Sequence, residues 1–86
     1  MISNAKEPVA WALLLTELDE AREHLEKLVN VMNHAGTIDD SEFAVYLGHV
    51  YAHLNRAWNS RNQNNEITED QWPVFSQFPR DLDPVG

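Results

Sequence analysis

The segment from Gly36 to Phe43 constrains the fold of this chain most strongly, because it ends one amphipathic segment and begins another within a few residues. Gly36 suits the left-handed conformation that often follows a helix. Asp39 has the character of an N-cap residue, and Glu42 follows it at the spacing of a capping box. Ile38 and Phe43 have the spacing of a hydrophobic staple across that helix start. A connection this short predicts two helices that lie side by side and antiparallel.

Helical periodicity extends on both sides of this connection. Pro8 fits the first position of a helix, which predicts a first helix over about residues 8–34, and a second is predicted over about residues 40–61. Leu13 and Val31 widen the apolar stripe of the first helix, and a wide stripe indicates contact with two neighbours. The stripes comprise Trp11, Leu14, Leu15, Leu18, Ala21, Leu25, Leu28, Val29 and Met32, and then Phe43, Tyr46, Leu47, Val50, Leu54, Ala57 and Trp58.

The length of the chain bears on how these helices assemble. Its 86 residues make a single all-α domain, residues 1–86. A lone two-helix hairpin encloses little core, and small helical chains often recruit a partner. We therefore expect a homodimer in which two antiparallel hairpins form a four-helix bundle, since two-fold dimers are the commonest assembly.

Composition excludes several function classes. Six Lys and Arg residues stand against 14 Asp and Glu residues, a net charge of −8, so nucleic-acid binding is not expected. This surface would suit a basic protein partner, or mimic nucleic acid towards one. The absence of cysteine excludes disulfides and thiolate chemistry. The longest apolar run, from Val9 to Leu15, is too short for a membrane span, so we expect a cytoplasmic protein.

Residues 62–86 are expected to form a linker and an extended aromatic tail. The segment from Thr68 to Gln71 has the pattern of a helix cap, which Pro73 is expected to interrupt after one turn. Trp72, Phe75 and Phe78 follow at intervals of three residues.

The aromatic tail has two interpretations. Its rings could cover the hairpin, of the same chain or of a second protomer, or the tail could dock into a groove of another protein. Trp11 and Trp58 are predicted at the open end of the hairpin, where the tail departs, so an aromatic cluster is expected there.

Histidines are the main candidates for a site. His49 and His53 are four residues apart on one side of the second helix, and His24 is predicted to face them from the first. With Glu20 one turn from His24, they could hold a single transition metal such as zinc, iron or nickel. The alternative is that these histidines merely cover apolar surface and hydrogen-bond a neighbour.

Other chemistry finds little support in the sequence. Glu17 and Glu20 are predicted on an exposed helix face, which gives no reason for acid–base catalysis. Gly48 lies within the second helix and indicates either a close helix crossing or space for a ligand. No catalytic or cofactor-binding motif emerges. The sequence favours a non-enzymatic assembly or protein-interaction module, and the alternative is a metal-binding bundle.

Overall fold

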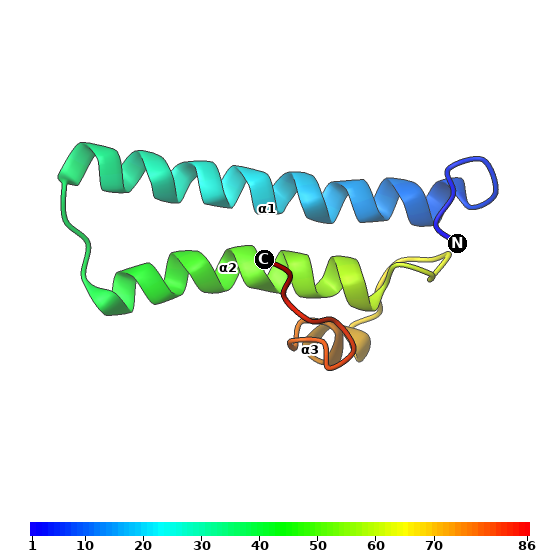
Figure 1. Ribbon diagram of the computed structural model, residues 1–86. Coiled ribbons are helices and arrows are strands. Elements are labelled where there is room, and N and C mark those ends of the chain that lie inside the picture. Colours follow the sequence, from blue (N-terminus) through cyan, green and yellow to red (C-terminus); the bar gives the residue numbers. More distant parts are fainter.

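The computed structural model describes residues 1–86 as an all-helical hairpin with a short third helix. Helix α1 spans Pro8–Ala35, α2 spans Asp40–Asn59 and α3 spans Gln71–Phe75. Helices α1 and α2 run antiparallel along a molecule 46 Å long, as Figure 1 shows. None of the three helices combines the length and apolar character that crossing a bilayer requires.

The hairpin connection follows the predicted cap chemistry. Gly36 adopts a left-handed φ of 72°, and its N–H donates to the carbonyl of Met32 at 2.9 Å. The Asp39 carboxylate accepts hydrogen bonds from the backbone N–H of Glu42 at 2.8 Å and from the Ser41 hydroxyl at 2.9 Å. The predicted end of the first helix and start of the second are thereby confirmed. Helix α2 ends at Asn59, slightly before the expected position.

The contact between α1 and α2 is made mostly by small side chains. Only eight of 86 residues are buried, and no large side chain is fully enclosed. Small residues let the two helix backbones approach closely, but they remove little apolar area from water. The buried hydrophobic residues are Ala10, Ala21 and Leu28 of α1 with Val50 and Ala57 of α2.

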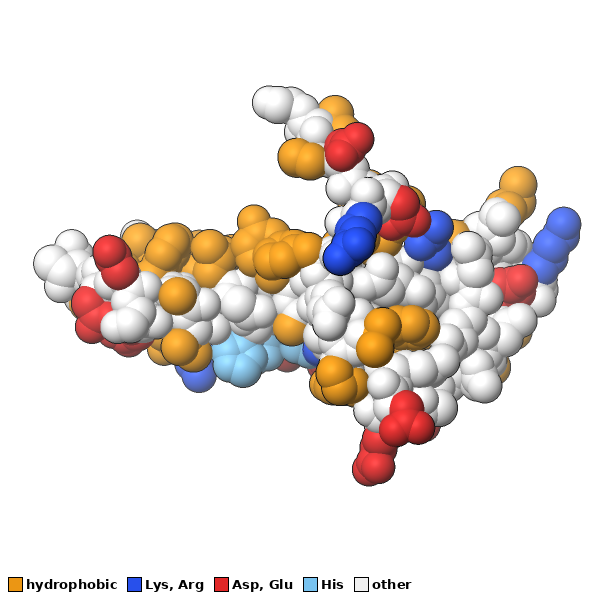
Figure 2. Space-filling view, turned by 90° about the horizontal axis from the view of Figure 1, so that it is seen from below, with side chains coloured by type: hydrophobic (Ala, Val, Ile, Leu, Met, Phe, Trp, Pro, Cys, Tyr) orange, Lys and Arg blue, Asp and Glu red, His pale blue; other side chains and the backbone are white.

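Larger apolar side chains stay exposed along one long edge of the hairpin. We call this set the apolar face; Figure 2 shows hydrophobic side chains along that edge and histidines along the opposite edge. Its α1 members follow at helical spacing, and at its tail end a shallow groove brings Leu14 and Leu18 next to Leu54 and Trp58. The apolar face comprises Leu18, Leu25, Val29 and Met32 of α1 with Phe43, Leu47 and Leu54 of α2.

The segment around α3 folds back and packs on the outer side of α2, away from α1 (Figure 1). Amide side chains anchor it, because Asn55 donates to the Ser76 carbonyl at 2.8 Å and Asn59 donates to the Phe75 carbonyl at 2.8 Å. Tyr51 meets Phe78 edge to face, with ring centroids 5.1 Å apart. These contacts lie within one chain and leave the apolar face largely uncovered.

Thr68 and Gln71 form the predicted cap before α3 through two reciprocal hydrogen bonds. The Thr68 N–H donates to the Gln71 side chain at 3.0 Å, and the Gln71 N–H donates to the Thr68 hydroxyl at 3.2 Å. The expected interruption at Pro73 is wrong, since α3 runs through this residue. Pro73 lies in the first turn, where a backbone N–H has no partner within the helix, so its missing donor costs little.

Gly48 does not mark a close crossing within the hairpin, contrary to the favoured sequence interpretation. The residue is exposed, and a Cβ added there would have no atom within 4 Å. It lies on the outward side of α2, so contact with α1 gives no reason for a glycine at this position.

Candidate functional site

The edge of the hairpin opposite the apolar face carries a cluster of charged and imidazole side chains. Its members come from both long helices and meet near the middle of the hairpin. We call this set the charge cluster; it comprises Glu17 and Glu20 of α1 with His53 and Arg56 of α2.

Glu17 is buried, which corrects the prediction of an exposed acidic pair. Its side chain is 11% exposed, and that of Arg56 is 6% exposed. The Arg56 Nε donates to Glu17 Oε2 at 2.7 Å. A buried carboxylate requires such a partner, because desolvation of an unpaired charge is very costly. Glu20, by contrast, is about half exposed, in keeping with the prediction.

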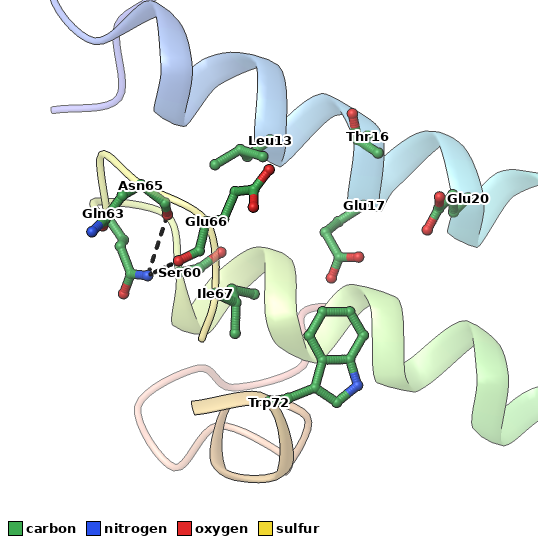
Figure 3. A pocket seen from close by; sticks show the side chains of 10 residues that line it. All are labelled: Leu13, Thr16, Glu17, Glu20, Ser60, Gln63, Asn65, Glu66, Ile67 and Trp72. Carbon is green, nitrogen blue, oxygen red and sulfur yellow. Dashed lines mark hydrogen bonds between the residues drawn. The ribbon is translucent and has the colours of Figure 1, made fainter. Parts of the chain in front are cut away.

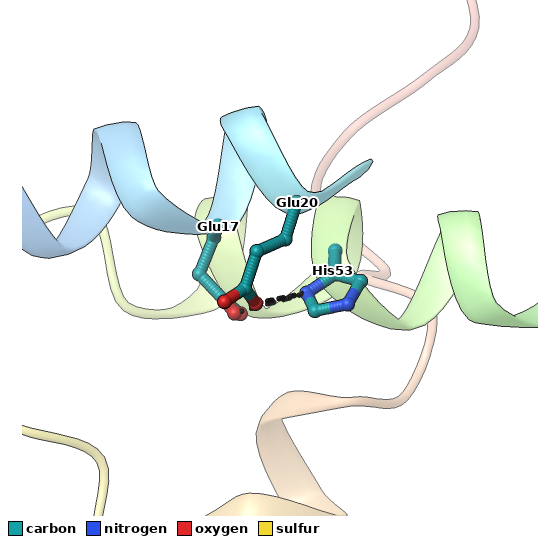
Figure 4. A group of neighbouring side chains, drawn as sticks. All are labelled: Glu17, Glu20 and His53. Carbon is teal, nitrogen blue, oxygen red and sulfur yellow. Dashed lines mark hydrogen bonds and ion pairs between the residues drawn. The ribbon is translucent and has the colours of Figure 1, made fainter. Parts of the chain in front are cut away.

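The other three side chains of the charge cluster all approach the Nδ1 atom of His53. It lies 3.1 Å from Glu17 Oε1 and 3.3 Å from Glu20 Oε2, and Figure 4 shows both carboxylates reaching from α1 towards this ring. It also lies 3.1 Å from Arg56 Nη2. The carboxylates require a donor at Nδ1, whereas the guanidinium requires an acceptor there. No single protonation state of His53 satisfies all three contacts.

The predicted histidine cluster assembles as a stack of rings. The His24 ring lies 5.2 Å from that of His49 and 5.1 Å from that of His53, with interplanar angles of 10° and 24°. Parallel rings carry their nitrogen atoms around the edges of the stack and not towards one common point. Of the four predicted metal ligands, only Glu20 and His53 belong to the group whose ligand atoms lie within 4.8 Å of one another, and Glu17 completes that group.

Arg56 connects the charge cluster to the segment around α3. Its Nη1 donates to the Ser76 hydroxyl at 2.8 Å, and its guanidinium carbon lies 4.1 Å from the centre of the Trp72 ring. A guanidinium over an indole face gains a cation–π attraction. One buried side chain thus contacts α1, its own helix and the segment around α3.

A cavity of about 250 Å³ opens next to Glu17 and Glu20, between α1 and the segment that follows α2. Figure 3 shows the Glu17 and Glu20 side chains along one side of it, with Trp72 below. Gln63 bridges the linker, donating to the carbonyls of Asn65 at 3.3 Å and Glu66 at 3.2 Å. The lining is polar apart from Leu13, Ile67 and Trp72.

The aromatic residues predicted to mediate interactions are spread over several surfaces. None of the three tryptophans takes part in a ring pair, so the expected aromatic cluster at the open end of the hairpin does not form. Two of them instead stack with arginines, Trp58 with Arg61 and Trp72 with Arg56. Trp72 and Phe78 remain 48% and 66% exposed, whereas Trp11 and Phe75 are half-buried.

Trp58 also binds the C-terminal segment through Asp81. Its indole N–H donates to Asp81 Oδ1 at 2.9 Å. That hydrogen bond holds the pKa of the Asp81 carboxyl below its ordinary value, with a smaller contribution from the charge of Arg61.

Sequence reasoning missed the buried roles of Glu17 and Arg56. A usable signal was present for Glu17, which lies four residues before Ala21 and seven after Ala10, on the stripe that the helix buries. A carboxylate in such a stripe requires a cationic partner. Arg56 has no comparable signal, because its partners Ser76 and Trp72 come from the tail.

Comparison with protein-family models, with curated proteins and with solved structures finds no match to this chain.

Proposed function

We propose that this protein is a non-enzymatic assembly module that acts as a homodimer, two hairpins pairing through their apolar faces into a four-helix bundle. The observation that carries the proposal is the mismatch between a core of small side chains and the large side chains left exposed. Leu18, Leu25 and Val29 are 43%, 46% and 49% exposed. Because about half of each side chain is already buried, completing its burial contributes about 1 kcal/mol each.

The dimensions of the apolar face support a second copy as its occupant. The face runs over both long helices of a molecule 46 Å long. A standard interface buries about 800 Å² on each partner, and the exposed side chains of this face extend along both long helices. A two-fold axis places the same surface of both copies opposite one another. Leucines of one copy therefore meet leucines of the other, and no separate complementary surface is needed.

The distribution of charge supports the same occupant. The chain has a net charge of −8, yet the apolar face contains no charged residue. A basic partner would gain its attraction from acidic surfaces elsewhere on the molecule. The two assemblies therefore differ in their response to salt. Screening of like charges should tighten a homodimer, whereas it should weaken a complex with a basic partner.

Sedimentation equilibrium of the purified chain at low and high salt tests this function. We expect a dimer that tightens as salt rises, and Leu25→Glu should dissociate it because two charges would then enter the interface. Val45→Glu is the matched control: Val45 is 61% exposed on the outward side of α2 and receives the same charge. A wild-type protein that stays monomeric at micromolar concentration would overturn the homodimer. Equal effects of the two substitutions would place the interface elsewhere.

A metal-binding bundle is the second candidate. It is supported by the stacking of His24 of α1 on both His49 and His53 of α2. Because these rings stack, the ligand set is better drawn from the carboxylates next to His53 than from three histidines. This candidate does not compete with dimerisation, since its residues lie on the opposite edge from the apolar face.

A further inference from the structure

We propose that Glu17, Glu20 and His53 form a binding site for one divalent transition metal ion of the zinc type, open to the adjoining cavity. The site lies on the opposite edge from the apolar face and does not depend on dimerisation. It goes beyond the three-histidine arrangement, because two of its ligands are carboxylates of α1.

The spacing of the ligand atoms fits a small cation. Zinc–nitrogen and zinc–oxygen bonds of about 2.0–2.2 Å place neighbouring tetrahedral ligands about 3.3–3.5 Å apart, and neighbouring octahedral ligands about 3 Å apart. His53 Nδ1 lies 3.1 Å from Glu17 Oε1 and 3.3 Å from Glu20 Oε2. Glu20 is half exposed, so its carboxylate is free to adjust around an ion.

The charges of the cluster also favour a cation. Two carboxylates stand against the single positive charge of Arg56, and His53 is charged only if protonated. A metal ion on Nδ1 would use the lone pair towards which both carboxylate oxygens point. The ion would remove the conflict between the carboxylates, which need a donor at Nδ1, and Arg56, which needs an acceptor there. Arg56 Nη2 would then no longer hydrogen-bond to Nδ1.

Neighbouring side chains hold the ligands in place. Arg56 Nε donates at 2.7 Å to Glu17 Oε2, the oxygen that does not face His53. Outer partners of this kind orient a ligating carboxylate. The His24 ring, 5.1 Å from that of His53, restricts the rotation of the imidazole. His24 is a positioning residue in this scheme, whereas His49 stacks on His24 and contacts none of the three ligands.

The donor set selects the class of metal. Imidazole nitrogen with carboxylate oxygen suits zinc, iron, cobalt and manganese, whereas magnesium and calcium prefer oxygen ligands alone. Three protein ligands leave at least one coordination position open. Glu17 and Glu20 also line the cavity of about 250 Å³, so that position is open to water or a small polar molecule.

Calorimetric titration of the chelator-treated full chain with Zn²⁺ tests the site, with Mg²⁺ as the comparison ion. We expect one Zn²⁺ per chain and much weaker Mg²⁺ binding. Glu20→Gln should weaken Zn²⁺ at least about tenfold, the loss that even outer partners cause. Glu20 is half exposed and its carboxylate forms an ion pair with His53 alone, so this variant should keep the fold. Glu23→Gln, the same change on an exposed residue of the same helix, should bind like the wild type.

A second measurement separates this site from one made by the stacked histidines. Nitrogen-detected NMR of the imidazoles should show Nδ1 of His53 shifting on Zn²⁺ addition, and His49→Ala should keep one bound ion. Absence of Zn²⁺ binding to the wild type would overturn the proposal. Unchanged binding by Glu20→Gln, or loss of binding in His49→Ala, would overturn it equally.

Discussion

Asp39 illustrates how a single exposed side chain decides where a helix begins. Its carboxylate accepts the Glu42 N–H at 2.8 Å, and this hydrogen bond, followed by that from Ser41, lowers the pKa of Asp39 below its ordinary value. A group whose pKa is lowered by folding stabilises the fold above its ordinary pKa of about 4. That contribution is lost as pH falls through the lower folded value.

Replacement of Asp39 by Asn tests this linkage at the residue scale. Asn caps a helix about as well as Asp but does not titrate, so acidification from pH 6 to pH 3 should destabilise the wild type more than the variant. Thermal unfolding followed by circular dichroism at both pH values measures the difference. Asp83→Asn, in the exposed tail, is the matched control and should unfold in parallel with the wild type at each pH. Parallel acid sensitivity of Asp39→Asn would show that the cap charge does not contribute.

At the scale of single elements, helix α2 carries a glycine that no contact within the chain requires. Gly48 is helical and exposed, and a side chain there meets open space. Glycine in a helix interior is less favourable than alanine because the unfolded chain has more freedom to lose. The residue therefore weakens the helix that supplies His53 and Arg56.

Gly48→Ala should raise the free energy of unfolding by about 1 kcal/mol. Chemical denaturation measures this gain at a fixed protein concentration, so that dimerisation contributes equally to each variant. Ala44→Gly, the reverse change at another exposed position of α2, should lower the stability by a similar amount. A destabilised Gly48→Ala would show that a neighbouring copy packs against the outward side of α2.

At the scale of the whole molecule, Arg56 of α2 contacts both α1 and the segment around α3, two helices that do not pack on each other. It binds Glu17 of α1 and Ser76 after α3, and it stacks on Trp72. Removal of one partner from a buried ion pair leaves an uncompensated charge, whereas apolar replacement of both is often tolerated. The pair is therefore expected to be strongly coupled.

Arg56→Met should lower the free energy of unfolding by about 3–5 kcal/mol and loosen the α3 segment. Denaturation measures the first effect, and hydrogen exchange of the amides in Gln71–Phe75 measures the second. Arg22→Met, at an exposed arginine of α1, should change neither appreciably. Glu17→Met combined with Arg56→Met should recover much of the loss. Additive effects in the double variant would contradict the coupling.

The hairpin could be predicted from the amino-acid sequence alone, because the interactions that define it are local. A glycine at φ 72°, an aspartate cap and helical periodicity each act within a few residues, so they can be read without knowledge of the rest of the fold. The same locality explains why the Thr68–Gln71 cap was predictable. The approach of His24 to His49 and His53 was predictable for another reason, because a short connection sets the register of two antiparallel helices.

Which polar groups are buried, and which apolar groups stay exposed, depends on how the folded elements pack together. Glu17 is buried because Arg56 meets it from α2, and Arg56 is held by a segment that returns from the far end of the chain. The tail packs on the outward side of α2, where Asn55 and Asn59 bind its carbonyls, so the apolar face stays open. These outcomes depend on contacts between residues distant in sequence, which periodicity and cap patterns do not encode.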